Sequence, residues 1–247
     1  MTKSRTVLGL ALAMAAFLVA GHAAAGGGKR PVVVELFTSQ GCNSCPPADV
    51  MLARLADRKD VLAMSLPITY WDMMGWKDTL ASEANTRRQK FYSEIMGHGG
   101  VYTPQMIVDG VSDVIGSREA TVEAAIALRE GDMDAVPVLL HATRQEIHVV
   151  VGPAPAHDGP DATIWMFHIL GKATVSIGAG ENEGHTLTYR NIVRDLKAIG
   201  IWKGPVVTLD LPRQDGTTAP HDAVAVIVQQ GGYGRIVGAA MIGHPDY

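Results

Sequence analysis

The feature that most constrains this chain is a pair of cysteines separated by two residues. Cys42 and Cys45 are its only cysteines and lie in the segment SQGCNSCPPAD, residues 39–49. An apolar, β-branched run at residues 31–37 precedes the pair and predicts a buried strand, whereas apolar residues at helical spacing follow it. A C-x-x-C pair is used in redox sites, in metal sites and in simple disulfide staples.

The start of the chain has the pattern of a secretory signal peptide. Lys3 and Arg5 supply the positive charge, Val7–Ala20 is apolar, and small residues up to Ala25 offer cleavage sites. We therefore expect residues 1–25 to be removed on export and the mature protein to be periplasmic or secreted. No later stretch has the length of a membrane span. In an oxidising compartment, the expected resting state of the pair is a disulfide.

The amino-acid composition limits the kinds of partner that we expect the protein to bind. The formal net charge of −4 gives no electrostatic reason to expect binding to nucleic acid or to an anionic membrane. Two cysteines are too few for the disulfide framework of a small secreted scaffold. We expect no cofactor, and the sequence does not specify the oligomeric state.

The pattern of elements changes near the middle of the chain. Residues 30–131 alternate strand and helix patterns, and Asp109-Gly110 within them predicts a tight hairpin. Residues 135–247 hold short β-rich runs separated by Gly, Pro and Asp, which is typical of a sandwich. Residues 191–199 fit a helix or a strand. We expect an α/β domain over residues 30–131 and a β-rich, sandwich-like C-terminal domain over residues 135–247.

The neighbours of the cysteine pair weigh against two of its common uses. Haem attachment needs a His directly after the second cysteine, where this chain has Pro46. A structural zinc site wants four ligands, and His98 with the two cysteines would leave it incomplete. The position between a strand and a helix favours a redox site, because a helix N-terminus can stabilise a thiolate.

The order of elements, with C-x-x-C after the first strand and Thr103-Pro104 before a later one, resembles a thioredoxin fold. More specifically, the chain resembles a family of secreted bacterial thioredoxin-like proteins of uncharacterised function. The resemblance implies that Pro104 is a cis-proline that faces the cysteines; the alternative is an ordinary trans-proline. The matching segments are VVELFTSQGCNSCPPAD, YWDMMGWKD, RRQKFY, VYTPQMIVDG and, more weakly, GENEGHTL.

The cysteine motif departs from that of well-studied thioredoxins. Gly41, rather than Trp, precedes the first cysteine, and Asn43-Ser44 separates the pair. Pro46 and Pro47 follow it, and a proline disfavours helical geometry in the residue before it. We therefore expect the helix to begin near Pro47, and Cys42 to lie further from its N-terminus than in thioredoxin.

Chemistry assigns a role to each cysteine. Cys42, nearer the exposed turn, would be the attacking thiolate, and Cys45 the resolving thiol. The resemblance implies a buried acid on the preceding strand that moves protons for the resolving thiol, and Glu35 is the candidate. The alternative is that Glu35 is a carboxylate on a solvated strand edge.

A second group of candidate residues follows the second predicted strand. The carboxyl ends of strands in an open α/β sheet meet at one edge, so this segment is expected beside the cysteines. Trp71, Asp72, Trp76 and Lys77, with Thr103, would form a wall that binds a partner. The alternative is a packed loop in which the tryptophans cover the core.

Two further segments carry polar residues without a clear assignment. His98 would be either a base or metal ligand near the site, or a histidine on a surface loop. Residues 181–183, Glu-Asn-Glu, would touch a cation or form a solvated turn, and the solvated turn is the default interpretation.

Three functional hypotheses follow. The first is an exported thiol–disulfide oxidoreductase that acts on protein thiols or disulfides. The second is a binding module in which the reduced pair holds a soft metal such as Cu(I), together with His98 or a methionine. The third is a non-catalytic interaction protein with an inert structural disulfide, a hypothesis that the two prolines after Cys45 keep open.

Overall fold

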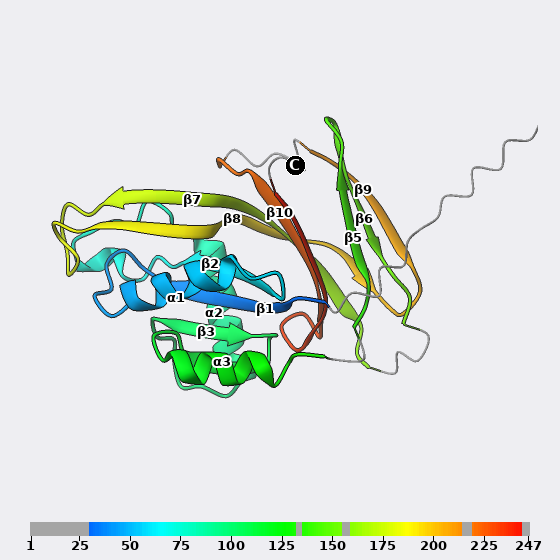
Figure 1. Ribbon diagram of the computed structural model, residues 1–247, viewed down its shortest axis with the longest axis horizontal. Helices are drawn as coiled ribbons and strands as arrows, with labels where there is room; N and C mark the ends of the chain where they lie inside the picture. Colours follow the sequence, from blue (N-terminus) through cyan, green and yellow to red (C-terminus); the bar gives the residue numbers. More distant parts are fainter. Residues whose placement is uncertain (1–29, 132–134, 155–158, 214–218, 244–247) are drawn as a thin grey trace, which may run out of the picture.

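The computed structural model describes residues 30–131, 135–154, 159–213 and 219–243 (Figure 1). The expected signal peptide, residues 1–25, lies outside the described residues. None of the helices in the described part of the chain has the length and hydropathy needed to cross a membrane. The elements in chain order are β1 (Val32–Thr38), α1 (Pro46–Ala56), β2 (Val61–Pro67), the 3-10 helix η1 (Asp72–Met74), α2 (Glu83–Ile95), β3 (Gln105–Val108), β4 (Ser112–Ile115), α3 (Glu119–Ala127), β5 (Val138–Ala142), β6 (Glu146–Val151), β7 (Ala162–Ser176), β8 (Thr186–Trp202), β9 (Val207–Pro212), β10 (Ala223–Gln230) and β11 (Ile236–Gly243).

The strands of the described residues form two sheets. The larger has the strand order β11-β10-β7-β8-β2-β1-β3-β4, and the smaller has the order β5-β6-β9. β1 lies inside the larger sheet, parallel to β2 and antiparallel to β3. Every residue of β1 is buried, as expected for a strand covered on both faces. This strand ends at Thr38 and leads directly to the cysteine pair.

The side chains of β1 alternate between two hydrophobic cores. Val34 and Leu36 pack in the core beneath α1 and α3. Val33 and Phe37 pack in the core on the opposite face, which contains Tyr92 of α2 and residues of β7 and β10. Because the side chains of a strand alternate with a period of two, each residue of β1 is assigned to one face.

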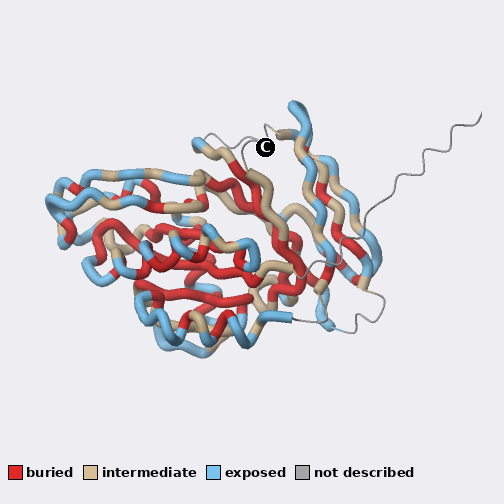
Figure 2. Tube along the Cα trace, in the orientation of Figure 1, coloured by how far each residue is buried: buried red, intermediate tan, exposed pale blue. Residues whose placement is uncertain are grey.

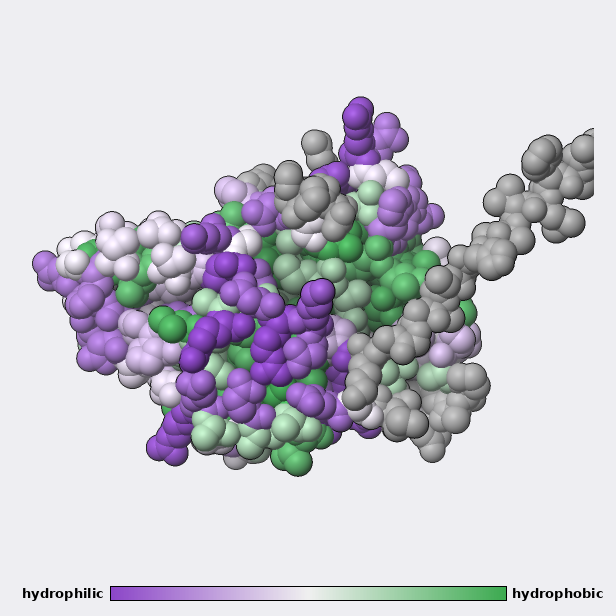
Figure 3. All heavy atoms as spheres, viewed as in Figure 1, coloured by the Kyte–Doolittle hydropathy of each residue, from purple (hydrophilic) through white to green (hydrophobic). Residues whose placement is uncertain are grey.

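The second half of the chain continues the larger sheet. β8 joins β2 through the pair Ser65 and Ile192, which covers a strand edge that would otherwise expose its backbone groups. The smaller sheet packs against the larger one through a core that includes Val149, Ile164 and Val226, and hydrophobic side chains fill this region in Figure 3. This second region is layered like a sandwich. Its strands nevertheless share a sheet with strands of residues 30–131, so a separate domain on either side of residues 131–135 stays a prediction.

Several local features can be compared with the predictions from the sequence. The ambiguous segment 191–199 lies within strand β8. Asp109 and Gly110 have positive φ angles of 50° and 73°, as the predicted tight hairpin between β3 and β4 requires. Helix α1 begins at Pro46, one residue before the expected start. Buried residues gather in the strands of the larger sheet, and the far end of the β7–β8 hairpin is mostly exposed (Figure 2).

Candidate functional site

The cysteine pair forms a disulfide at the junction of β1 and α1. The Cα atoms of Cys42 and Cys45 are 5.5 Å apart, and the turn is closed by a hydrogen bond from the Cys45 N–H to the Cys42 carbonyl at 3.2 Å. Cys42 Sγ lies 3.2 Å from the Ser44 hydroxyl. Both cysteines have 0% of their surface exposed. The disulfide is therefore formed, as expected, but is enclosed by the protein.

The start of α1 offers little hydrogen bonding to a thiolate. Cys45 is the N-cap, and Pro46 and Pro47, which have no N–H, occupy the first helical positions. The next two N–H groups, of Ala48 and Asp49, donate to the Cys45 carbonyl at 2.8 and 3.1 Å. Only the partial charge of the helix N-terminus is left to stabilise a thiolate at this end.

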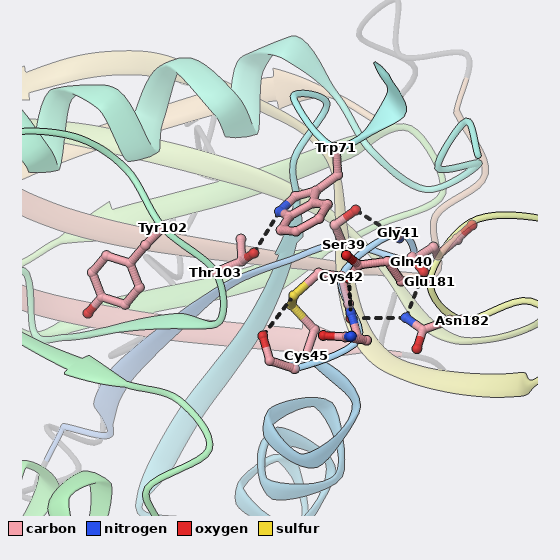
Figure 4. The surroundings of a disulfide bond; sticks show 12 residues. Ser39, Gln40, Gly41, Cys42, Cys45, Trp71, Tyr102, Thr103, Glu181 and Asn182 are labelled. Carbon is pink, nitrogen blue, oxygen red and sulfur yellow. Dashed lines mark hydrogen bonds between the residues drawn. A yellow bond between two sulfur atoms is a disulfide. The ribbon is translucent and has the colours of Figure 1, made fainter. Parts of the chain in front are cut away.

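Trp71 and Thr103 lie beside the disulfide (Figure 4). The indole Nε1 of Trp71 donates to Thr103 Oγ1 at 2.8 Å. A Cβ atom placed on Gly41 would lie 3.3 Å from Trp71 Cβ and 3.6 Å from the Trp71 carbonyl oxygen, so the start of the Trp71 side chain and its backbone pack closely on the cysteine loop. The Thr103–Pro104 peptide bond is cis, as predicted. The structure thus brings these two candidate residues, from different loops, to the cysteine pair.

The rest of the predicted wall consists of two partly buried residues that support the loops, Asp72 and Trp76, and the exposed Lys77. Trp76 donates from Nε1 to Oε1 of Gln40 at 2.8 Å, two residues before Cys42. Asp72 accepts the Asp78 N–H at 3.0 Å and so shapes its own loop. Lys77 is exposed next to Trp76.

Asp78, which the sequence did not single out, anchors the cysteine loop. Its Oδ2 accepts the Gln40 N–H at 2.8 Å, and its Oδ1 accepts the N–H groups of Leu80 and Ala81 at 2.8 and 3.1 Å. Burial raises the pKa of this carboxyl, and the backbone hydrogen bonds oppose the increase. The residue ties the segment before Cys42 to the loop that follows β2.

Residues of the β7–β8 loop also reach the cysteines, although the sequence suggested a solvated turn at 181–183. Asn182 is only 5% exposed, and its Nδ2 donates to the carbonyls of Gln40 and Cys42, both at 2.9 Å (Figure 4). Glu181 is exposed and accepts the Asn43 N–H at 3.0 Å. The solvated-turn interpretation is therefore wrong for Asn182. The only sequence signal was the weak GENEGHTL resemblance.

Glu35 has a setting different from the one expected. It is 0% exposed, so the interpretation as a solvated strand edge is wrong. Its carboxylate accepts from Arg88 Nε at 2.5 Å and Nη2 at 3.0 Å, and from the Tyr92 hydroxyl at 2.5 Å. Both partners belong to α2, on the face of β1 opposite α1. A carboxylate held in this ion pair is a structural group, and the arrangement does not support the expected role in proton transfer at Cys45.

Asp49 is a second buried carboxylate, and it lies on the cysteine side of the sheet. It follows Cys45 by four residues on α1, a spacing that places two side chains on one helix face. Neither carboxylate oxygen makes a hydrogen bond of normal geometry with another described residue. Burial raises the pKa of Asp49 well above its usual value; the Thr38 hydroxyl opposes the rise and the charge of Asp78 adds to it. Sequence reasoning missed this residue because an acid in a first helical turn is ordinarily exposed.

Among the described residues, no group of three His, Cys, Asp or Glu side chains forms around the cysteine pair. His98 lies on the loop after α2, and its Nε2 is 2.9 Å from Asp113 Oδ2. The Tyr102 hydroxyl and Gln105 Nε2 donate to the same Asp113 carboxylate. Across the described ranges, no three His, Cys, Asp or Glu side chains converge as metal ligands would. This donor arrangement gives the soft-metal hypothesis no support beyond the two cysteines themselves.

Comparison with known proteins places the chain among relatives whose titles give no activity. A crystal structure of a structural genomics target from Agrobacterium tumefaciens is 31% identical, with a TM-score of 0.77, over 87% of this chain and 95% of that one. HBP35 of Porphyromonas gingivalis is 15% identical, with a TM-score of 0.59, over 87% of this chain and 75% of that one, and shows a similar fold only. No curated protein matches significantly. The family model described as "Protein of unknown function (DUF1223)" matches residues 33–229, and the chain belongs to that family.

Proposed function

We propose that residues 30–131 are a thioredoxin-like domain and that the protein is an exported thiol–disulfide oxidoreductase acting on protein thiols or disulfides. The observation that carries this proposal is a disulfide between neighbouring cysteines at a strand-to-helix junction, bordered by Trp71 and Thr103. The strand order β2-β1-β3-β4, with α1 and α3 on one face and α2 on the other, supports the domain assignment. Periplasmic or secreted localisation rests on the pattern of residues 1–25.

In the proposed reaction, the two cysteines exchange two electrons with a partner. The Cys42 thiolate attacks one sulfur of a partner disulfide, forms a mixed disulfide and releases the other partner sulfur as a thiolate, which takes up a proton. Cys45 then loses its proton and attacks Cys42 Sγ. The mixed disulfide breaks, and the second partner sulfur leaves as a thiolate. The cysteine pair ends oxidised and the partner reduced; the same steps reversed oxidise a partner dithiol.

Asp49 is the group that we assign to the proton on Cys45. It lies one helical turn after Cys45, it is buried, and burial raises its pKa, which makes the carboxylate a stronger base than an exposed one. Glu35 is unsuited to this role because its carboxyl oxygens are paired with Arg88 and Tyr92 on the face of β1 opposite α1.

Full burial of both cysteines favours one competing function. An enclosed disulfide with no free N–H at the helix start would be a structural staple, and the protein would then act as a binding partner through the loop that carries Trp71 and Trp76. Such disulfides resist reduction by the cellular glutathione pool.

The redox equilibrium of the pair separates the two functions. Mature, metal-free protein is equilibrated in glutathione buffers, and free thiols are trapped and counted. A potential between about −120 and −270 mV, the range of known exchange catalysts, is expected for the oxidoreductase. A value below about −300 mV, typical of structural disulfides, would reject that function. A Cys45→Ser variant, which cannot resolve a mixed disulfide, then captures partners on Cys42.

A further inference from the structure

Among the described residues, a single hydrogen bond reaches a cysteine sulfur. It joins the hydroxyl of Ser44 to Sγ of Cys42, with 3.2 Å between the two atoms. Neither sulfur of a disulfide carries a hydrogen, so the hydroxyl donates and the sulfur accepts. Ser44 is exposed, whereas Cys42 is fully buried. The contact therefore lies at the boundary between the solvent and the enclosed sulfur.

The backbone N–H groups around the pair donate to oxygen atoms instead. Cys42 donates to the Ser39 carbonyl at 3.2 Å, and Cys45 donates to the Cys42 carbonyl at 3.2 Å. Asn43 donates to Oε2 of Glu181 at 3.0 Å. The first two N–H groups of α1 after its prolines donate to the Cys45 carbonyl. These donors are thus used within the fold and make no hydrogen bond to the sulfur.

The side chains around the pair do not replace these donors. The indole N–H of Trp71 is directed to Thr103 Oγ1 at 2.8 Å (Figure 4), and an indole has no second donor. The charged groups on the elements around the pair are Asp49 on α1, Asp72, Lys77 and Asp78 on the segment after β2, and Glu181 on the β7–β8 loop. Most of these charges are negative, and negative charges disfavour a thiolate.

We propose that Ser44 is a catalytic residue of the pair, and that its hydroxyl donates to the Cys42 thiolate in the reduced protein and so favours the attacking form. A hydrogen bond to a charged acceptor is about twice as strong as one between neutral groups. The contact therefore strengthens when the disulfide opens and Cys42 releases its proton to solvent. Ser44 supplies the donor that two prolines remove from the start of α1.

This inference deepens the proposed oxidoreductase function and rests on it for its biological meaning, whereas the hydrogen bond is tested without a partner. In a Cys45→Ala protein, Cys42 carries the only thiol, and alanine adds no new hydroxyl. The ultraviolet absorbance of the thiolate then follows the ionisation of Cys42 as the pH rises. Tyrosinate also absorbs there, so the absorbance of a protein with both cysteines replaced by alanine is subtracted.

Adding Ser44→Ala to the Cys45→Ala protein should raise the midpoint of this ionisation by about one pH unit, the shift expected for losing a hydrogen bond to a charged group. Ser44→Thr keeps the hydroxyl and should leave the midpoint where it is with serine. Because Ser44 is exposed, neither change opens a cavity in the core.

Asn43→Ala is the matched control. It removes the neighbouring exposed side chain of the same turn and keeps both the Ser44 hydroxyl and the Asn43 N–H that Glu181 accepts. Its midpoint should equal that of the Cys45→Ala protein. An unchanged midpoint in Ser44→Ala, an equal shift in Asn43→Ala, or a threonine variant that behaves like the alanine variant would overturn the proposal.

The redox potential separates this inference from the proposed function. With both cysteines present, and at a pH above both midpoints, the potential of Ser44→Ala should be about 30 mV more negative than that of the wild type, the value of a tenfold change for a two-electron couple. Potentials below about −300 mV in both proteins would reject the oxidoreductase, while the difference between them would still test Ser44. A wild-type potential in the range of exchange catalysts, with no shift in the variant, would reject only the role of Ser44.

Discussion

Glu35 and Asp49 are buried carboxylates on opposite faces of the same sheet, and their surroundings differ sharply. Glu35 accepts two hydrogen bonds from Arg88 and one from Tyr92, and the guanidinium is itself surrounded by aromatic rings. Asp49 has no hydrogen bond of normal geometry to its carboxylate among the described residues. The resemblance to thioredoxin-like proteins pointed to Glu35 as the acid of the site, because the family places an acid on the strand before the cysteines.

The comparison teaches that burial alone does not identify a functional acid. A buried carboxylate paired with a cation makes the fold sensitive to the loss of either partner, because the remaining charge would be buried uncompensated. Burial of a carboxylate without such a partner favours the neutral form and raises its pKa. We therefore expect changes on the Glu35 face to alter the stability of the fold, and changes on the Asp49 face to alter the chemistry of the pair.

The largest expected effect comes from breaking the ion pair. Arg88→Met leaves Glu35 buried without a cation and should lower the free energy of unfolding by about 3–5 kcal/mol, as measured by urea denaturation. Adding Glu35→Gln should recover part of the loss, because the unpaired charge is removed. If the redox potential of the cysteine pair differed between the folded double variant and the wild type, the Glu35 face would also affect the chemistry of the pair, which would contradict the proposed separation.

An intermediate effect is expected from Asp49→Asn. The pKa of Asp49 is raised in the folded state, so the wild-type fold is unaffected below the unfolded pKa and loses stability as pH rises toward the folded value. Each pH unit in that window costs about 1.4 kcal/mol. The stability of the variant should therefore equal that of the wild type near pH 3.5 and exceed it at pH 7. Thermal unfolding measured over this pH range checks the prediction.

The same variant tests the chemical role of Asp49. If this carboxylate takes the proton from Cys45, Asp49→Asn should slow the resolving step and flatten its dependence on pH. Equal stability of variant and wild type at pH 7, together with an unchanged pH–rate profile, would contradict the contrast between the two carboxylates.

The smallest effect is expected at the border of the disulfide. Thr103→Val removes the hydroxyl that accepts from the Trp71 indole and keeps the shape of the side chain. It should cost about 1 kcal/mol of stability and leave the pH dependence unchanged, because neither carboxylate is involved. A double-mutant cycle with Trp71→Phe isolates the pair; a coupling energy near zero would show that the contact contributes little.

Sequence reasoning succeeded where the determining interactions are local. The apolar run before the cysteines predicted β1, and Asp109-Gly110 predicted the turn whose positive φ angles those residues tolerate. The resemblance to thioredoxin-like proteins predicted the cis bond at Thr103-Pro104, and the expected oxidising compartment predicted the disulfide of the closely spaced cysteines. Each of these features depends on residues within a few positions of one another.

The tertiary structure alone decided which groups surround the disulfide. Arg88 reaches Glu35 from 53 residues away, and Asn182 reaches the Cys42 carbonyl from 140 residues away. No local periodicity encodes such contacts, because they depend on which face α2 covers and on how far the β7–β8 hairpin extends past the sheet. The sequence by itself therefore determined a cysteine pair at a strand-to-helix junction. Only the packing of distant segments decided that this pair is buried, that Glu35 is paired with Arg88, and that Asp49 is buried without a cationic partner among the described residues.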